Sequence, residues 1–302
     1  MIIVYNFAIR LYYFAIWGAS FFNKKASLWM EGRNNIFSAL ERDFDSESAV
    51  IWVHCASLGE FEQGRPLIET FQKEGDYKIL LTFFSPSGYE IRKDYPQADW
   101  VYYLPLDTPS NAQRMLDIVR PQKMIFVKYE IWYHFLSTAQ NRGIPTVLVS
   151  ALFRENQFFF KWYGKAFLEV LQGFRQIFVQ DEFSKKVLLK NGVEKSIVAG
   201  DTRVDRVSEI AQKADKIPIV DAFVQSSNIL IAGSTWAQDE ALLIPFIHDL
   251  KTKNWQFIIA PHEVDKSHIE SICQQLNVEY ICFSQANTNN CLLYTSPSPR
   301  DS

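Results

Sequence analysis

Apolar runs rich in β-branched and aromatic residues alternate, from residue 49 onward, with stretches whose apolar residues recur three and four positions apart. The first pattern is typical of strands buried on both faces and the second of amphipathic helices. Their alternation predicts an α/β fold in which helices connect parallel strands. The expected strands are 50–55, 78–84, 100–104, 123–127, 145–150, 176–180 and 196–199, and the expected helices include 61–73, 111–120, 131–142 and 161–172.

The alternation relaxes around residues 201–220, where charged residues and Pro218 replace the apolar runs. We expect an interdomain linker at 206–227. A second series follows, with strands at 228–232, 256–260 and 278–283 and helices from about Gln238 and Val264. The pattern therefore predicts two α/β domains with parallel sheets, 23–205 and 228–286, of which the second is incomplete.

The first 22 residues form an apolar run that only Asn6 and Arg10 interrupt. No small-residue cleavage pattern precedes Lys24, so the run does not indicate a signal peptide. Its length suits a bilayer crossing, but an arginine near its middle would cost about 2.5 to 3.5 kcal/mol. The run is apolar on all faces, which disfavours a buried core helix. We expect 1–22 to be a membrane-associated helix that either spans the bilayer or lies in one leaflet.

The composition of the chain and the spacing of its cysteines exclude several classes of protein function. The chain has 48% hydrophobic residues, 31 basic and 34 acidic residues and a net charge of −3. That balance disfavours disorder and a nucleic-acid partner. The four cysteines share no CxxC or CxH spacing, so the sequence predicts reduced thiols and neither a metal site nor a disulfide framework.

The last stretch, 287–302, loses all periodicity and ends in Ser and Pro residues. One interpretation is a disordered tail. The other is a chain that was cut short, because the stretch interrupts a βα series and residues 291–302 resemble translated adapter or vector sequence. We expect 287–302 to be non-native or disordered.

Two strand-to-helix junctions in the first domain carry the same pattern, Ser57 to Glu60 and Ser87 to Glu90. Both fit a capping box, in which the serine caps the helix and the glutamate reaches back. The functional interpretation places Glu60 at the carboxyl edge of a parallel sheet, where such folds bind ligands. There the carboxylate could accept a proton from an attacking hydroxyl.

Charged residues follow two further strands of this domain. Lys128 and Glu130 come directly after the fourth strand, where they either begin a solvated helix or face the same edge. Arg203 follows a glycine turn and could hold a phosphate or carboxylate, or form a surface ion pair with Asp201 or Asp205.

Small polar residues mark the strand ends of the second domain. Gly233, Ser234 and Thr235 follow its first strand, and Pro261 and His262 close the next. These residues suit an anion or nucleotide cradle, although the spacing matches neither a Walker loop nor GxGxxG.

These motifs in this order resemble the 3-deoxy-D-manno-octulosonic acid (Kdo) transferases, from residue 1 to about residue 285. The matching stretches are HCASLGE at 54–60, LTFFSPSG at 81–88, YLPLDTP at 103–109, KYEIW at 128–132, AGDTRVD at 199–205, AGST at 232–235 and IIAPHE at 258–263. The resemblance implies a GT-B glycosyltransferase with two Rossmann-like domains, which transfers Kdo from CMP-Kdo to a lipid A precursor. It also implies action at the cytoplasmic face of the inner membrane, without metal or cofactor.

The resemblance also assigns roles to single residues. The general base falls on Glu60, and the two charge-stabilising positions fall on Lys128, where the family commonly has glutamate, and Arg203, where it commonly has lysine. Because Lys128 reverses the charge, Glu130 is the alternative acidic group. The implied acceptor-binding residues are Ser57, Gly59, Ser87 and Gly88, and the implied donor-binding residues are Gly233, Ser234, Thr235, Pro261 and His262.

The second domain departs from the family pattern. Its Pro-Arg-His nucleotide contact reads Pro261-His262-Glu263 here, without the arginine. The later glycine-rich and Asn-Pro-Leu-Glu-like donor motifs are absent, and we expect them beyond residue 302. The chain as given is therefore expected not to transfer Kdo. Two other functions stay open: another two-domain sugar-nucleotide enzyme such as a UDP-sugar epimerase, and a noncatalytic, membrane-bound, lipid-binding fragment.

Overall fold

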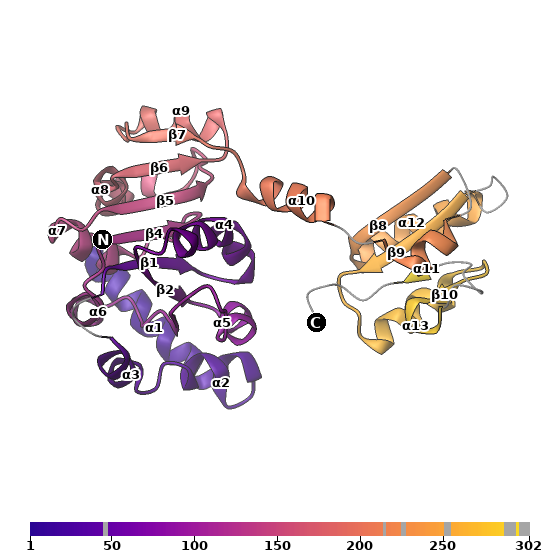
Figure 1. The fold of residues 1–302 in the computed structure, drawn as a ribbon, viewed down its shortest axis with the longest axis horizontal. Coiled ribbons are helices and arrows are strands. Elements are labelled where there is room, and N and C mark those ends of the chain that lie inside the picture. The colour runs from indigo at the N-terminus through magenta and orange to yellow at the C-terminus, as the bar shows by residue number, and fades with distance from the viewer. Residues whose placement is uncertain (45–47, 214–215, 225–227, 251–254, 287–293, 296–302) are drawn as a thin grey trace. The chain divides into compact units, whose positions relative to one another are not determined.

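The computed structural model describes residues 1–44, 48–213, 216–224, 228–250, 255–286 and 294–295. The chain divides into two compact units, Met1–Gln212 and Lys213–Ser302, and each is described by itself (Figure 1). Each contains a parallel β-sheet with helices packed on it, which confirms the α/β class predicted from the sequence.

The first unit is built on a seven-stranded sheet with the order β3-β2-β1-β4-β5-β6-β7. Every neighbouring pair is parallel, so all the carboxyl ends lie at one edge. The strands are β1 (Val50–Cys55), β2 (Lys78–Phe83), β3 (Trp100–Tyr103), β4 (Lys123–Val127), β5 (Thr146–Ala151), β6 (Gln176–Val179) and β7 (Ser196–Val198). All seven strands were predicted, with ends that differ by no more than one residue.

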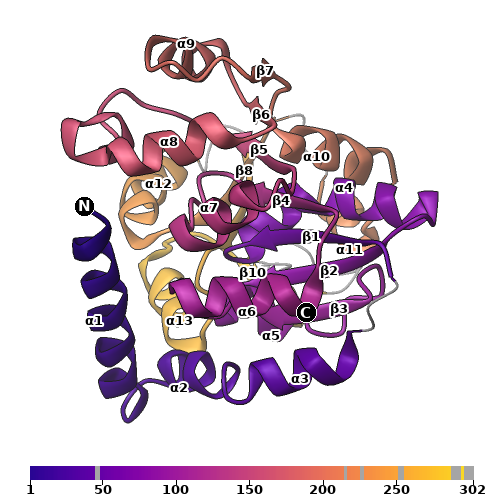
Figure 2. The same cartoon turned by 90° about the vertical axis from the view of Figure 1, so that its left-hand side faces the viewer.

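Helices cover both faces of this sheet (Figure 2). One face packs Phe61 and Ile68 of α4 against Val53 and Leu81, and the other packs Phe135 of α7 with Trp52 and Phe126. The short helices α2 and α3 were not predicted. The helices are α1 (Ile2–Ser20), α2 (Lys24–Glu31), α3 (Ile36–Asp43), α4 (Leu58–Glu74), α5 (Pro86–Arg92), α6 (Pro109–Val119), α7 (Tyr133–Asn141), α8 (Lys165–Gly173), α9 (Glu182–Lys190) and α10 (Thr202–Lys213), with 3-10 turns η1 (Phe158–Phe160) and η2 (Trp162–Gly164).

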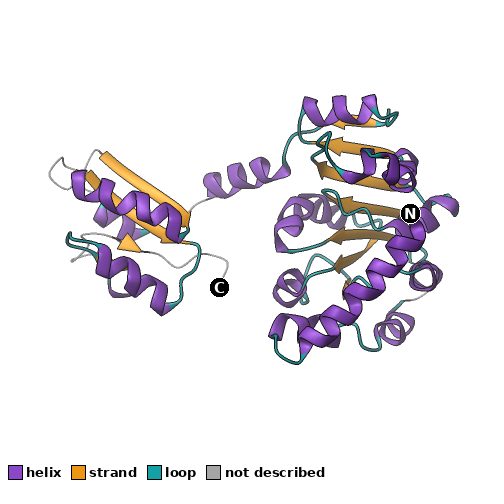
Figure 3. Ribbon diagram, turned by 180° about the vertical axis from the view of Figure 1, so that it is seen from behind, coloured by secondary structure: helices purple, strands orange, loops and turns teal. Residues whose placement is uncertain are grey.

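The apolar helix α1 lies against the body of the first unit (Figure 3). Polar contacts fix it there. The Tyr5 hydroxyl donates to Oδ2 of Asp107 at 2.5 Å, and Asn6 Oδ1 lies 2.5 Å from Nε2 of His134. Asp107 also accepts the backbone N–H groups of His134 and Phe135 at the start of α7. One buried carboxylate therefore holds two helices that are far apart in sequence.

No residue of α1 is buried, so the core-helix alternative does not describe it. Its length and composition would suit a membrane span. Ile3, Phe7, Leu11 and Phe14 follow one another at helical spacing and are 58% to 84% exposed. The helix thus has one face bound to the protein and one apolar face turned outward.

The second unit has a four-stranded parallel sheet of order β10-β11-β9-β8. Its core consists of Ile244, Ile247, Phe257, Ile259, Ile272 and Leu276. The strands are β8 (Asn228–Thr235), β9 (Trp255–Pro261), β10 (Ile281–Cys282) and β11 (Tyr294–Thr295), and the helices are α11 (Pro218–Phe223), α12 (Ala237–Leu250) and α13 (Lys266–Gln275), with a 3-10 turn η3 (Phe283–Gln285).

The stretch 206–227, expected to be a linker, contains most of α10 and all of α11, because a sequence rich in charged residues is found in linkers and in helices alike. The strand expected at 278–283 is only the two-residue β10. Of the tail 287–302, the structure describes only β11, which pairs with β9 and β10, and the rest lies outside the described residues.

The Asp107→Ala variant should be destabilised by roughly 3 kcal/mol or more. It leaves one hydroxyl and two backbone N–H groups without their acceptor, at about 1–3 kcal/mol for each buried group. Asp117→Ala is the matched control, because Asp117 forms an exposed ion pair with Arg142 of the kind that contributes about 0–1 kcal/mol. Urea unfolding of both variants measures the difference. Equal losses would show that Asp107 does not carry the α1 and α7 attachment.

A candidate active site at the carboxyl edge of the first sheet

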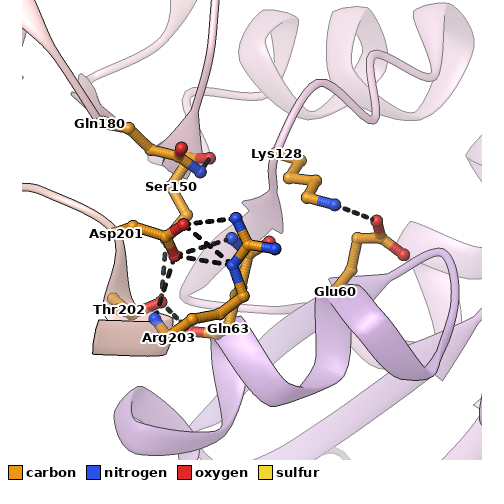
Figure 4. Close-up of polar contacts among 8 residues, drawn as sticks. All are labelled: Glu60, Gln63, Lys128, Ser150, Gln180, Asp201, Thr202 and Arg203. Atoms are coloured by element: carbon orange, nitrogen blue, oxygen red, sulfur yellow. Dashed lines mark hydrogen bonds and ion pairs between the residues drawn. The ribbon is translucent and has the colours of Figure 1, made fainter. Parts of the chain in front are cut away.

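The carboxyl edge of the seven-stranded sheet brings together charged residues from three parts of the chain (Figure 4). Glu60 lies in the first turn of α4, directly after β1. Lys128 follows β4, the neighbour of β1 in the sheet. Arg203 lies in the first turn of α10, after β7. The sequence prediction that these strand ends share one edge is therefore what the topology produces.

Glu60 and Lys128 form an ion pair of 2.8 Å between Oε1 and Nζ. Only 14% of the Glu60 side chain and 23% of the Lys128 side chain are exposed. Ser57 donates its hydroxyl to the other carboxylate oxygen of Glu60. Burial works to raise the pKa of Glu60, but the hydrogen bonds from Lys128 and Ser57 outweigh it and lower the pKa. Glu60 is therefore an ionised carboxylate with a cation against it.

Lys128 has a left-handed backbone with φ of 64°, and Ser150 on the adjacent strand β5 has φ of 52°. Neither residue is glycine, so each conformation costs of order 1–3 kcal/mol. The Lys128 N–H donates to Val149 O at 2.8 Å, which holds the turn against the sheet. Strain at two adjacent strand ends is typical of a functional edge, where the surrounding sheet maintains it.

Glu130 has the opposite electrostatic environment from Glu60. Burial and the negative charge of Glu60 raise the pKa of Glu130 to about 7, against smaller lowering effects of Trp132 and Lys128. Two carboxyl groups at one edge thus have pKa values displaced in opposite directions, and such pairs commonly divide acid and base roles. Glu130 can take up or release a proton near neutral pH.

Arg203 forms an ion pair with Asp201, which is one of the two partners considered from the sequence. Its Nε lies 2.9 Å from Oδ2 of Asp201, and Gln63 on α4 donates to Oδ1 at 3.0 Å. Burial opposes ionisation of Asp201, but Arg203 and Gln63 outweigh it and lower its pKa to about 2. The Arg203 side chain is 58% exposed and, among the described contacts, binds no group of Glu60.

Further hydrogen bonds attach this loop to the sheet. Thr202 donates to the backbone oxygen of Gln63 at 2.8 Å and lies 3.0 Å from the Ser150 hydroxyl. Gln180, after β6, donates to the backbone oxygen of Ser150 at 2.9 Å. The loop after the edge strand β7 is therefore joined to α4 near Glu60 (Figure 4).

Sequence reasoning missed a buried network behind the Glu60–Lys128 pair. Trp132 Nε1 donates to Nε2 of His54 at 3.1 Å, and His54 Nδ1 lies 2.9 Å from the hydroxyl oxygen of Thr82. Because an indole N–H only donates, Nε2 must accept and Nδ1 must carry the proton. Burial lowers the pKa of His54 to about 3, so the ring is neutral. The network ties the loop containing Lys128 and Glu130 to β1 and β2, and the only sequence signal was a histidine inside a buried strand.

The capping boxes predicted at the two junctions are not formed. Ser57 is the N-cap of α4, but its hydroxyl donates to Glu60 and caps no backbone N–H. The N-cap of α5 is Ser85, whose side chain accepts from the N–H of Ser87. The Glu90 side chain instead accepts from the Tyr103 hydroxyl at 3.1 Å. A proline at 86 begins the helix one residue before Ser87, which explains the shift.

The predicted acceptor-binding residues differ in their surroundings. Ser57 contacts Glu60, and a Cβ on Gly59 would meet nothing closer than the Ser57 hydroxyl at 3.7 Å. Gly88 is buried, and a Cβ there would lie 2.3 Å from the Phe83 ring, so its lack of a side chain is required by packing. Ser87 is exposed and lies 2.9 Å from the Ser85 hydroxyl.

The predicted donor-binding residues gather at the carboxyl edge of the second sheet. Ser234 Oγ, at the end of β8, lies 2.8 Å from Nδ1 of His262, which directly follows Pro261 and β9. The half-exposed Trp236 stacks on His262 with ring centroids 4.3 Å apart.

Thr235 supports the turn behind these rings. Its hydroxyl donates to the buried Glu240 at 2.9 Å, and Nε2 of His268 lies 3.1 Å from the same carboxylate. Gly233, by contrast, has open space where a Cβ would point. In the part of the chain that the structure describes, no three metal-ligating side chains gather.

Comparison with known proteins identifies a family model within the first unit and relatives that match most of the chain. A family model described as 3-Deoxy-D-manno-octulosonic-acid transferase (kdotransferase) matches residues 31–206. The 3-deoxy-D-manno-octulosonic acid transferase of Aquifex aeolicus is 26% identical over 77% of this chain and 62% of its own length. That of Haemophilus influenzae is 26% identical over 79% of this chain and 57% of its own length. A bifunctional glycosyltransferase/methyltransferase of Fusobacterium nucleatum is 22% identical over 83% of this chain and 40% of its own length. The chain thus spans about half the length of these relatives.

Solved structures show the same fold. UDP-GlcNAc 2-epimerase of Neisseria meningitidis, bound to UDP-GlcNAc, matches with a TM-score of 0.56 at 18% identity, over 83% of this chain and 72% of its own. The UDP-GlcNAc 2-epimerase of Methanocaldococcus jannaschii matches with a TM-score of 0.56 at 15% identity, over 83% and 73%. At this identity the likeness concerns the fold, which is the GT-B-like class predicted from the sequence.

The Glu130→Gln variant should be more stable than the parent chain at pH 8 and gain little near pH 4. The raised pKa means that the folded state keeps a proton between about pH 4.5 and 7 that the unfolded state has released, so stability falls as pH rises through this range. The amide removes that loss, worth roughly 1–3 kcal/mol at pH 8. Thermal melting at the two pH values, with the exposed Glu74→Gln as charge-loss control, measures it. A gain that is equal at both pH values would contradict the raised pKa.

Proposed function

Since the chain belongs to the 3-deoxy-D-manno-octulosonic acid transferase family of glycosyltransferases, we propose that it contains the acceptor half of an enzyme transferring Kdo from CMP-Kdo to a lipid A precursor during lipopolysaccharide assembly. The observation that carries the proposal is the half-buried Glu60–Lys128 pair at the carboxyl edge of the sheet, beside Glu130. We place the enzyme at the cytoplasmic face of the inner membrane.

The proposed reaction inverts configuration in a single displacement. An acceptor hydroxyl attacks the anomeric carbon of Kdo, the bond from that carbon to the CMP phosphate oxygen breaks, and a carboxylate takes the hydroxyl proton. Glu60 is ionised and is the first candidate for the base. Its lowered pKa makes it a weak one, whereas Glu130 has a pKa near neutrality and can take the proton onward or directly.

Positive charge at the same edge favours departure of the anionic leaving group. Lys128 and Arg203 supply two cations there, and α4 begins beside them with its N-terminus. Both cations are paired with carboxylates. An incoming anion would therefore compete with Glu60 for Lys128 and with Asp201 for Arg203.

The second unit is proposed to bind the nucleotide of CMP-Kdo. Ser234, Trp236 and His262 offer a hydroxyl, an exposed ring and an imidazole at one sheet edge, next to the N-terminus of α12. Protection of the protein by CMP but not by UDP distinguishes this proposal from a UDP-sugar epimerase, which the fold comparison alone would equally allow.

A lipid acceptor is supported by an apolar pocket of about 350 Å³ that borders Glu130. Tyr129, Ile131 and Trp132, from the segment after β4 that also contains Glu130, line the pocket, and residues of α1 line it as well. The remaining lining residues are Met1, Val4, Tyr5, Ala8, Phe158 and Phe167. An acyl chain is the kind of group that such a wall accepts.

We further propose that α1 lies in the membrane surface and does not cross the bilayer. Crossing would remove Tyr5 from Asp107 and Asn6 from His134, leaving the buried Asp107 without the hydroxyl that donates to it. An in-plane helix keeps those contacts and buries the outward face of Phe7, Leu11 and Phe14 in lipid.

In the complete enzyme, Glu60→Gln should lower the turnover of Kdo transfer by about 10² to 10⁴, because an amide keeps the shape of the side chain but takes no proton. Glu62→Gln, on the same helix and paired with Arg65 and Arg92, is the control and should keep its turnover. Circular dichroism melting of both variants tests the fold. A folded and fully active Glu60→Gln enzyme would remove Glu60 from the chemistry and leave Glu130 as the base.

The double variant Phe7→Asp/Phe14→Asp should move the chain from the membrane pellet to the supernatant after cell fractionation. Both side chains are more than 60% exposed, at 68% and 62%, so the fold does not depend on them. Phe183→Asp, at a 56% exposed position on α9, controls for the added charge and should stay in the pellet. Continued sedimentation of the double variant would mean that another surface attaches the protein.

A further inference from the structure

A polar pocket of about 290 Å³ lies beside α1, and none of the candidate active-site residues lines it. Arg33 and Arg114 form its charged part, and Tyr13 on α1, Ser38 on α3 and Asn111 on α6 supply hydroxyl and amide groups. No aspartate or glutamate is among its lining residues. A pocket with two guanidinium groups, several neutral donors and no carboxylate has the composition of an anion site.

Arg33 is a largely buried cation that the described contacts pair with no carboxylate. Its guanidinium donates to the backbone oxygens of Leu104, Trp29 and Phe84 at 2.8 to 3.0 Å. These bonds use three of the five N–H groups of an arginine. The guanidinium carbon also lies 3.8 Å from the ring centre of Trp29 and 4.7 Å from that of Tyr103.

The carbonyls and rings around Arg33 stabilise its charge without neutralising it. Burial lowers the pKa of Arg33 to about 9, so the group is still a cation at neutral pH. The pocket therefore has a fixed positive charge in a partly dry environment, where an anion would be attracted more strongly than at an open surface.

Arg114 adds a second cation, which is more exposed than Arg33. Nη2 of Arg114 lies 2.8 Å from Oε1 of Glu41, and about half of each side chain is exposed. Its guanidinium also lies over the Phe37 ring at 4.6 Å. Because an exposed ion pair of this kind contributes only about 0–1 kcal/mol, a stronger anion can draw Arg114 away from Glu41.

We propose that this pocket binds the phosphate of an anionic lipid headgroup at the membrane surface. The guanidinium group matches the geometry of both phosphate and carboxylate, and phosphate is the group that the lipid headgroups of a membrane surface carry. A membrane source is favoured over a soluble one because Tyr13 belongs to α1 and contacts Phe14, an exposed residue of its apolar face, with ring centroids 5.9 Å apart. The inference rests on the proposed attachment of α1 to membranes. To that attachment it adds a site that prefers anionic lipids over neutral ones.

The test uses the purified 302-residue chain and two kinds of vesicle, one of phosphatidylcholine alone and one with phosphatidylglycerol added. The parent chain should bind both, and bind the anionic vesicles more tightly. Arg114→Gln should reduce the preference for anionic vesicles about fivefold, the effect expected for one basic residue near such a surface. Ser38→Glu, at an exposed position in the first turn of α3 where a carboxylate is tolerated, should reduce it at least as much.

Lys190→Gln is the matched control, because Lys190 also forms an exposed ion pair, with Glu155 at 3.0 Å. It should leave the preference unchanged. Equal losses in Arg114→Gln and Lys190→Gln would overturn the pocket in favour of general surface charge. Soluble glycerol 1-phosphate provides the other arm: if it binds the parent chain and Arg114→Gln abolishes that binding while both vesicles bind alike, the ligand is a soluble phosphate and the lipid assignment is wrong.

The two vesicle types also separate this inference from the attachment on which it rests. Failure of the parent chain to bind either vesicle would contradict membrane attachment by α1. Equal binding to both vesicles would leave the attachment standing and contradict the headgroup site.

Discussion

The parallel alignment of the strands in the first unit determines where its polar chemistry can lie. Helices cover both faces of the sheet, so β1 is buried along its whole length and offers no exposed face for charged groups. Charged side chains on the chain segments of the sheet can therefore reach water only at the strand ends. Since every strand runs the same way, the residues that follow β1, β4 and β7 meet at one edge, although Glu60 and Lys128 are 68 residues apart in sequence.

At that edge the charges are arranged as two ion pairs, Glu60 with Lys128 and Asp201 with Arg203. Glu130 is a third carboxyl group beside these pairs, and burial and the negative charge of Glu60 favour its protonated form. The charges of these five groups therefore nearly cancel. Any anionic substrate has to exchange partners with a carboxylate, which makes binding there selective for groups that replace those contacts well.

Much of this arrangement could be predicted from the sequence because it depends on repeating patterns. Apolar runs located the strands of the first unit, and the chain order of Glu60, Lys128 and Arg203 after three of them was enough to put them at one edge. The pairing of Lys128 with Glu60 was not predictable, since it needs the left-handed turn that follows β4. The bond from Trp132 to His54 joins residues 78 apart and leaves no periodic signal.

The capping boxes show the opposite error, in which a correct local pattern loses to its surroundings. Ser57 and Glu60 have the spacing of a capping box, but Glu60 forms an ion pair with Lys128. The Ser57 hydroxyl donates to the same carboxylate and caps no backbone N–H. At the second junction, Pro86 moves the start of α5 and Tyr103 takes Glu90. Short motifs describe what a segment prefers in isolation, and tertiary contacts between charged or aromatic groups are strong enough to override them.

The attachment of α1 through Asp107 has a consequence for synthesis of the chain on the ribosome. The helix leaves the exit tunnel before the residues that hold it: Tyr5 binds a carboxylate 102 residues later, and Asn6 binds a histidine 128 residues later. Over that interval the nascent chain presents an unattached apolar helix to whatever lies nearby. A lipid surface or a chaperone that shelters α1 until α7 has emerged would therefore act as a folding partner of the young chain, and the order of translation becomes part of how the helix reaches its place.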